Sequence, residues 1–398
     1  MTRIPRVALT VAALALAAAT VAAAPRQATP AREGGAPSAA ELAAAIGALG
    51  DFDYDTRTAA ARTVRRAPAP VAAEALARAV REHDDEYVRY RALVLLAGLG
   101  ESAAAPLMRD AITDRNDRIR TVAYGWFEHH PDPAVLPALF QALDREGSEF
   151  TRPALTRAVA AHGADPRARE ALVPLVLRGE DFFRGAAIEA LGDYGRTYAI
   201  AEISQVARLD GPLQDDAITA LGRLGQPESV DLLVALQREV PRERQPTVSA
   251  SLCLLGRNCE THYRFIVESM EFGAANEGQQ PLLRGATHAL GMLALAGREA
   301  ALAALFDAGV PSRDPARSPI ALGVGLVALR NPDLLLRVLD GYRDRDGAII
   351  LLRDAFDMLS EDFEEERFYV HVRRAFWAAP EGSPRRTLTE ALIQRLDF

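Results

Sequence analysis

An arginine returns at nearly constant spacing in the first half of the sequence. It stands at Arg57, Arg89, Arg120, Arg152 and Arg184, in steps of 32, 31, 32 and 32 residues. A residue that can cap a helix precedes each arginine by four positions: Asp53, Asp85, Asn116, Ser148 and the weaker Glu180. A fixed period of this length, with an apolar run after each arginine, is typical of a solenoid. The sequence therefore predicts a repeat scaffold.

The rest of the chain carries a helical pattern. From Ala39 to Phe398 apolar residues recur at helical spacing, and Gly, Pro, Asp or Asn interrupts them at short intervals. In one unit, Asp132–Asp144 is predicted as an outer helix and Glu149–Ala161 as an inner one. Each helix pair has an apolar face too large to cover alone, so neighbouring pairs must stack. We expect one all-α domain over this whole range, a right-handed α-solenoid of about ten antiparallel helix pairs around one continuous core.

A short motif recurs inside this pattern. An acidic cap, a helix of small apolar residues that ends in Leu-Gly or a similar pair, and a following Asp or Pro appear, wholly or in part, in four segments: Asp85–Gly100, Glu189–Gly195, Ala217–Pro227 and Ser251–Gly256. These segments resemble HEAT repeats, in particular the short type first noticed in phycobilisome lyases. The resemblance extends over about residues 39–330. From about residue 361 the repeat register is lost, which suggests a divergent C-terminal cap.

The resemblance implies a role for the recurrent cap and arginine. In HEAT proteins these residues form a ladder between successive repeats, and an acceptor at a helix start can meet a cation one turn further along a neighbour. The ladder would comprise Asp53, Arg57, Asp85, Arg89, Asn116, Arg120, Ser148, Arg152 and Arg184. We expect it to be structural; the alternative is a ladder that binds a ligand.

The N-terminus has the pattern of a secretory signal. Arg3 and Arg6 precede the uncharged run Val7–Ala24, and small residues suit cleavage after Ala23. We expect a signal peptide over 1–23, a flexible linker over 24–38, and a periplasmic or secreted mature protein with no stable membrane insertion. The alternative is an uncleaved anchor, since the run is just long enough to span a bilayer.

Charge and composition exclude several classes of function. Removing Arg3 and Arg6 with the signal takes the formal net charge from −8 to −10, which argues against nucleic-acid binding. All 46 basic residues are arginine, so Schiff-base chemistry and a P-loop lysine are absent from the sequence. The sequence also lacks His-Glu-x-x-His and Gly-x-Ser-x-Gly. We expect no enzymatic activity and no cofactor.

Enzymes with HEAT-like repeats fit poorly. Deoxyhypusine hydroxylase holds iron through repeated His-Glu pairs, and no histidine of this sequence precedes a glutamate. Phycobilin lyases and HEAT-like DNA glycosylases act in the cytoplasm, so the predicted signal counts against both.

Two cysteines and three histidines are candidate site residues. Cys253 and Cys259 flank one tight turn, which predicts a disulfide in an exported protein; two buried free thiols are the alternative. His130 and His162 lie 32 residues apart, on the same rung of neighbouring repeats, and His129 stands beside the first. They could share a zinc ion with a carboxylate. The alternative is that each histidine caps the negative end of its own inner helix.

Aromatic residues cluster near the recurrent arginines. We expect the following rings to line up near the starts of the inner helices: Tyr54, Tyr87, Tyr90, Tyr124, Phe150, Phe182 and Phe183. Rigid aromatic side chains on a concave ridge can anchor a peptide or protein. The competing explanation is that they plug the ends of the core. A second candidate surface is the acidic run Glu361, Asp362, Glu364, Glu365 and Glu366, which is also typical of a solvated helix start.

Two functions remain. The first is a non-catalytic extracytoplasmic scaffold or adaptor that binds a protein or peptide partner on the concave face of the solenoid. The alternative is a ligand- or metal-binding protein, conceivably a lyase-like enzyme, that uses the region of His129, His130 and His162. The sequence does not identify the partner or the oligomeric state.

Overall fold

The computed structural model describes residues 35–359, 362–396 and 398. The predicted signal peptide over 1–23, most of the predicted linker over 24–38 and Glu361 lie outside the described residues. The structural statements below concern residues 36–398, which form one compact unit.

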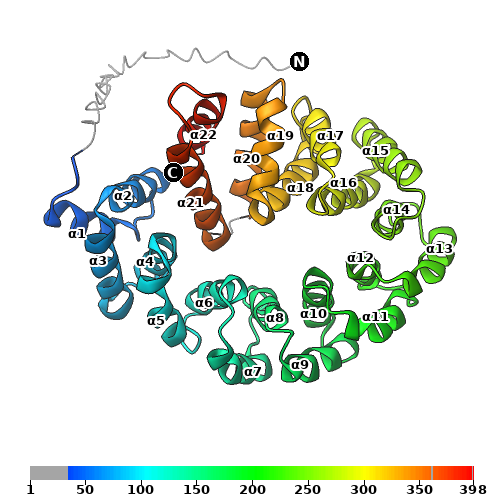
Figure 1. Ribbon diagram of the computed structural model, residues 1–398, viewed down its shortest axis with the longest axis horizontal. Helices are drawn as coiled ribbons and strands as arrows, with labels where there is room; N and C mark the ends of the chain where they lie inside the picture. The colour runs from blue at the N-terminus through cyan, green and yellow to red at the C-terminus, as the bar shows by residue number, and fades with distance from the viewer. Residues whose placement is uncertain (1–34, 360–361, 397) are drawn as a thin grey trace, which may run out of the picture. The chain divides into compact units, whose positions relative to one another are not determined.

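These residues fold into stacked helix pairs (Figure 1). One layer faces the inside of the curve: α2 (Tyr54–Arg66), α4 (Glu86–Leu99), α6 (Asp117–His129), α8 (Arg152–Ala161), α10 (Asp181–Asp193), α12 (Gln214–Leu224), α14 (Gln245–Leu254), α16 (Gln280–Leu295), α18 (Arg317–Arg330) and α20 (Arg345–Leu359). The other faces outwards: α1 (Ala39–Ala48), α3 (Ala69–Glu82), α5 (Glu101–Ala111), α7 (Leu136–Arg145), α9 (Pro166–Leu177), α11 (Ile200–Ala207), α13 (Val230–Glu239), α15 (Cys259–Ala275), α17 (Glu299–Gly309) and α19 (Pro332–Gly341). The predicted all-α solenoid is therefore confirmed.

Short 3-10 turns precede three of the outer helices, at Pro133–Val135, Thr197–Ala199 and Pro227–Ser229. The chain ends with α21 (Asp362–Ala378) and α22 (Pro384–Arg395). Within the described residues no single helix is long and apolar enough to cross a membrane, and α18 with α19 passes that test only as a pair bent by 118°.

The Leu-Gly motif is explained by close packing of the inner helices. A Cβ atom on Gly192 of α10 would lie 2.8 Å from the Cα atom of Ala220 in α12. A Cβ atom on Gly222 would lie 2.7 Å from the Cα atom of Ser251 in α14. Glycine at these positions lets successive inner helices approach more closely than any side chain would allow.

The predicted helix caps are present in part. Asp53, Asp85 and Asn116 each accept a hydrogen bond from a backbone N–H in the first turn of the following helix. Glu180, the weaker candidate, makes no such bond. Ser148 is not a cap either, because its helix begins later, at Arg152.

The recurrent arginines bind partners other than the predicted ones. Arg89 donates to the carbonyl of Val80 at 2.9 Å and Arg184 to that of Val176 at 3.1 Å, near the ends of their preceding outer helices. Arg152 likewise binds the carbonyl of Leu143, and Arg57 binds the carbonyls of Asp51 and Phe52. These bonds satisfy carbonyls that a helix end or a turn would leave without a partner.

Only two of the five arginines reach a carboxylate of the next repeat. Arg89 pairs with Asp114 at 2.5 Å, and Arg120 pairs with Glu146 at 2.8 Å. The expected ladder with the capping residues was therefore wrong, because the caps are already engaged by their own helices. The acceptors lie instead in the turns that lead into the next inner helix.

The core divides at α14, contrary to the single continuous core that we expected. One cluster of buried apolar residues runs from α1 to α14 and the other from α14 to the C-terminus. The buried face of α14 carries Thr247, Ser249 and Ser251, whose hydroxyl groups interrupt the apolar surface.

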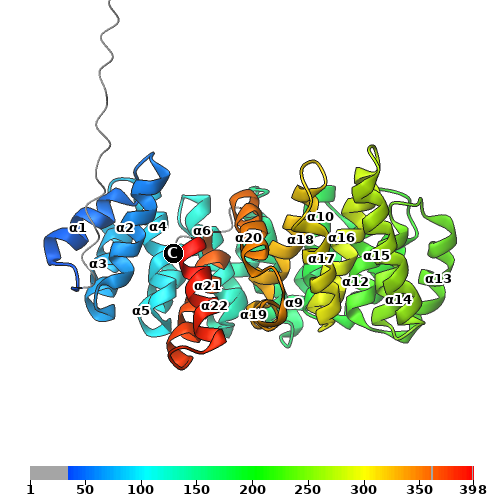
Figure 2. The same ribbon diagram turned by 90° about the horizontal axis from the view of Figure 1, so that it is seen from above.

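Helix α21 joins the two ends of the solenoid. It packs against α18 and α22 and also against α4 and α6, so that the helix pairs close into a ring (Figures 1 and 2). Its residue Phe363 belongs to the first core cluster, whereas Phe368 belongs to the second. Gly125 in α6 makes room for this contact, because a Cβ atom there would lie 2.7 Å from the ring of Phe363. The C-terminal segment is thus a clasp across the ring and not only a cap.

Candidate interaction surface

The predicted row of aromatic residues divides into exposed and buried members. Tyr54, Phe150 and Phe182 are exposed to 58%, 86% and 45%. Tyr90 and Tyr124 are buried, and Tyr87 and Phe183 are partly buried. The seven rings therefore do not form one exposed stripe, and the buried ones plug the core as in the competing explanation.

The buried rings have partners inside the protein. The hydroxyl of Tyr90 donates to Asp362 of α21 at 2.5 Å, and that of Tyr124 donates to the carbonyl of Ile112 at 3.3 Å. Burial raises the pKa of Tyr124 to about 12, and the nearby Glu146 adds to the effect. Phe183 lies under the guanidinium of Arg152, 4.9 Å from its ring centroid. These side chains stabilise the fold and are not available to a partner.

The exposed rings lie at or just before the starts of inner helices. Tyr54 and Phe182 stand in the first turn of α2 and α10, and Phe150 stands in the turn before α8. Phe52, in the turn before α2, is fully exposed as well and was missed by the sequence analysis. We call Phe52, Tyr54, Phe150 and Phe182 the aromatic rim. Its signal in the sequence is that each ring directly follows a carboxylate: Asp51, Asp53, Glu149 and Asp181.

The equivalent ring in α4 shows what the rim can bind. Tyr87 in α4 belongs to the same repeat position, but the guanidinium of Arg118 lies over its ring at 5.6 Å. Beside it, Arg115 forms an ion pair with Glu86. The chain therefore covers one ring and its neighbouring carboxylate with its own arginines.

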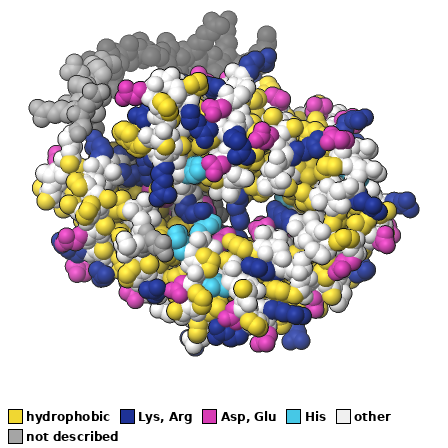
Figure 3. Space-filling view, in the orientation of Figure 1, with side chains coloured by type: hydrophobic (Ala, Val, Ile, Leu, Met, Phe, Trp, Pro, Cys, Tyr) yellow, Lys and Arg dark blue, Asp and Glu magenta, His cyan; other side chains and the backbone are white. Residues whose placement is uncertain are grey.

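The inside of the ring holds a network of ion pairs rather than an apolar groove. Figure 3 shows charged side chains and histidines gathered around its middle. Glu128 of α6 accepts hydrogen bonds from Arg157 of α8 at 2.9 Å and from the hydroxyl of Tyr194 at 3.0 Å. Arg330 lies 3.5 Å from Glu128 and also 3.5 Å from Asp193 of α10. The network connects the two halves of the solenoid.

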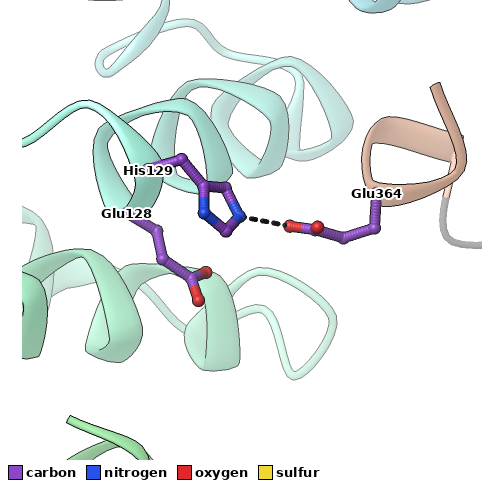
Figure 4. A group of neighbouring side chains, drawn as sticks. All are labelled: Glu128, His129 and Glu364. Carbon is purple, nitrogen blue, oxygen red and sulfur yellow. Dashed lines mark hydrogen bonds and ion pairs between the residues drawn. The ribbon is translucent and has the colours of Figure 1, made fainter. Parts of the chain in front are cut away.

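His129 and α21 form the edge of this network (Figure 4). The Nε2 atom of His129 lies 3.0 Å from Glu364, which also binds Arg367 at 2.5 Å. Burial raises the pKa of Glu364, but the hydrogen bond and charge of His129 and the charge of Arg367 outweigh it and lower the pKa to about 2. Glu364 is therefore ionised in the folded protein at neutral pH.

The chemistry of this group disfavours a metal ion. Ligand atoms of Glu128, His129 and Glu364 lie within 4.8 Å of one another, a spacing that a cation could bridge. Arg157 and Tyr194 already occupy both oxygens of Glu128, however, and Arg367 occupies one oxygen of Glu364. A metal ion would have to displace these donors and lie beside the positive charges of Arg157 and Arg367.

The other two histidines do not join this group. The Nδ1 atom of His130 lies 3.1 Å from the carbonyl of Trp126, and its ring stacks on the indole at 3.9 Å. The Nδ1 atom of His162 lies 2.7 Å from the carbonyl of Ala158. Both turn back onto the last turn of their own helices, as in the capping alternative. A site shared by His129, His130 and His162 is therefore not formed.

The cysteines and a cavity beside them lie elsewhere. Cys253 and Cys259 are joined by a disulfide. The turn that they close lines a cavity of about 680 Å³, together with parts of α13, α14 and α15. Its lining includes Gln237, Arg257 and His262, and burial lowers the pKa of His262. No carboxylate lines this cavity, so the described residues provide neither an acid–base pair nor a metal-ligand set there.

Replacing Glu364 by glutamine is expected to reduce the acid sensitivity of folding. A carboxyl with a lowered folded-state pKa adds stability at neutral pH, and this stability is lost as the pH falls from about 5 to about 2. A shift of the pKa of Glu364 from the ordinary value of 4.5 to about 2 contributes at most about 3 kcal/mol to the free energy of unfolding. Urea unfolding of wild type and Glu364→Gln over this pH range measures it. A difference between the two that stays constant over the range would contradict the prediction.

Comparison with known proteins places the repeats in a family. The family model described as HEAT repeats matches residues 42–126. No curated protein matches the sequence.

Several solved structures are similar to parts of this chain. YibA of E. coli is 16% identical, with a TM-score of 0.41 over 56% of this chain and 83% of YibA. A chain from the complex of CpcE and CpcF of phycocyanin lyase from Nostoc sp. PCC7120 is 18% identical, with a TM-score of 0.35 over 65% of this chain and 97% of that one. Importin beta is 13% identical, with a TM-score of 0.39 over 89% of this chain and 55% of its own. At these values the likeness says nothing of a shared activity or partner.

Proposed function

We propose that this chain, whose residues 42–126 match a model of HEAT repeats, is a non-catalytic scaffold outside the cytoplasm that holds a protein or peptide partner on the aromatic rim. The observation that carries the proposal is the exposure of Phe150 and Phe182 at the same position of the adjacent α8 and α10 repeats, with Tyr54 exposed one position further back in the α2 repeat. Exposed apolar residues are common singly, but a periodic row of rings is what an extended partner needs for anchoring.

The rim replaces the concave face as the proposed binding surface. Helix α21 packs across the inner helices α4 and α6, and the pairs of Glu128 with Arg330 and of Glu364 with His129 cross the inside of the ring. A partner in this space would have to break those contacts. The rim is open to solvent and requires no such change.

The proposed location rests on two features. The first is the signal-like pattern of Arg3, Arg6 and the apolar run after them. The second is the disulfide between Cys253 and Cys259, a bond that persists in oxidising compartments. Both fit a periplasmic or secreted protein.

Affinity capture from the organism's own envelope or culture fluid tests the proposal. The bait is the mature protein, and mass spectrometry identifies proteins and metals in the eluate. We expect a near-stoichiometric protein partner that is lost with the double variant Phe150→Ser and Phe182→Ser. Trp377→Ser, which removes a ring exposed to 74% at the end of α21, is the matched control and should keep the partner. A partner held equally by all three baits would contradict binding at the rim.

A further inference from the structure

We infer that the partner presents an extended segment with arginine side chains to the aromatic rim. This inference rests on the proposed function and adds the chemistry of the partner. It is carried by the contact that the protein already makes at the equivalent position of α4.

The contact at α4 combines two interactions. The guanidinium of Arg118 lies over the ring of Tyr87 at 5.6 Å, and Arg115 pairs with Glu86, the carboxylate that precedes the ring. A cation over an aromatic face is attracted by the electrons of the ring, and an ion pair with the neighbouring carboxylate adds to this. The pair of ring and carboxylate is thus a site for guanidinium groups.

The same pair recurs where the rim is exposed. Glu149 precedes Phe150 before α8, and Asp181 precedes Phe182 in α10, while Asp53 precedes Tyr54 in α2. Asp181 already binds Arg184 at 2.8 Å, and the exposed Glu180 stands beside it. The repeats of α8 and α10 therefore each offer an exposed ring together with at least one carboxylate. In α2 the protein already makes the contact itself, because Arg57 lies over the ring of Tyr54 at 5.8 Å and Thr56 donates to Asp53.

The charge of these turns favours a basic partner. In the turns over 51–55, 144–150 and 178–182, seven carboxylates are exposed: Asp51, Asp53, Asp55, Asp144, Glu149, Glu180 and Asp181. Two arginines are exposed in the same turns, Arg145 and Arg178. The excess of negative charge attracts a positively charged segment and repels an acidic one.

Geometry favours an extended chain. Helices α8 and α10 pack side by side, and packed helices lie about 8–10 Å apart. An extended chain in the polyproline II conformation advances about 3.1 Å per residue with three residues per turn, so side chains three residues apart lie on one face at a similar separation of about 9 Å. Arginines at this spacing could reach Phe150 and Phe182 together. Arginine suits the site better than lysine, because its planar guanidinium both stacks on a ring and binds a carboxylate through two N–H groups.

Fluorescence polarisation with synthetic peptides tests the inference on the mature protein. The probes are labelled peptides of repeated Arg-Ser-Gly, Lys-Ser-Gly and Glu-Ser-Gly triplets. We expect the arginine peptide to bind, the lysine peptide to bind more weakly and the glutamate peptide not to bind. The variant Phe150→Ser with Phe182→Ser should lose roughly tenfold or more in affinity for the arginine peptide. Glu149→Gln should also weaken binding, whereas Trp377→Ser should not.

Two outcomes would overturn the inference. One is binding of the glutamate peptide as tightly as the arginine peptide. The other is an arginine peptide that neither binds nor competes with a captured partner whose retention depends on Phe150 and Phe182. The second outcome would contradict the proposed chemistry of the partner but not the scaffold proposal. If the rim variants capture the partner as well as the wild type does, the scaffold proposal and this inference are both contradicted.

Discussion

Glu128→Ala is expected to lower the free energy of unfolding by about 3–5 kcal/mol, the cost of leaving a buried charge without its partner. Glu128 is 4% exposed and binds Arg157 and the hydroxyl of Tyr194. Burial opposes the charge of Arg157, yet Glu128 and Glu189 nearby hold its pKa above the usual value. Without Glu128, the arginine stays buried with its main counter-charge removed.

Urea denaturation followed by circular dichroism measures this loss. Glu170→Ala is the matched control, since Glu170 lies on the outer helix α9 with an exposed side chain and should change stability by no more than about 0.5 kcal/mol. Equal stabilities of Glu128→Ala and wild type would show that the network inside the ring does not form in solution.

Glu366→Ala is expected to cost about 4 kcal/mol by opening the clasp of α21. Glu366 is 3% exposed and pairs with Arg65 of α2, which lies 301 residues away in the sequence. It also binds Arg373 at 2.9 Å. Without the carboxylate, the positive charges of Arg65 and Arg373 repel each other where the two ends of the solenoid meet.

Glu366→Ala should destabilise helices at both ends of the chain. Hydrogen exchange is expected to increase in α2 and α4 as well as in α21, because the pair joins these helices. Glu381→Ala, which changes an exposed residue in the turn before α22, should leave exchange in α2 unchanged. Faster exchange confined to α21 would contradict a clasp that stabilises the N-terminal repeats.

The fold could be predicted because the information is local. Each repeat carries its own caps, its own apolar face and its own Leu-Gly motif, so one repeat predicts the next. The same locality explains why the caps at Asp53, Asp85 and Asn116 were found from sequence alone. The disulfide between Cys253 and Cys259 could be predicted for the same reason, because it spans one turn.

The clasp could not be predicted, because it joins residues that the repeat does not relate. Nothing near His129 in the sequence identifies Glu364 as its partner, and His130 and His162 were grouped with it only by their spacing. The acidic run before and within α21 was visible, but the partners that make it a clasp, Arg65 and His129, lie far away in the chain. Gly98 and Gly125 were local signals, because they are glycines inside apolar helices where Glu366 and Phe363 now pack.

The aromatic residues show the limit of periodicity. Tyr87, Phe150 and Phe182 occupy one repeat position, yet Tyr87 is covered because the next repeat places Arg118 over its ring. Period alone gives the position of a ring, while exposure depends on the side chains of the neighbouring repeat. The sequence therefore predicts where the rings of the rim lie but not which of them are exposed.

Site-specific photo-crosslinking tests binding at the rim most directly. Phe150→p-benzoylphenylalanine places the reactive group at a ring exposed to 86%, and Val71→p-benzoylphenylalanine on the outer helix α3 is the control. We expect the captured partner to crosslink from position 150 and not from position 71. Crosslinks from position 71 alone, with the partner still retained by both variants, would place the interface on the outer helices and contradict the rim.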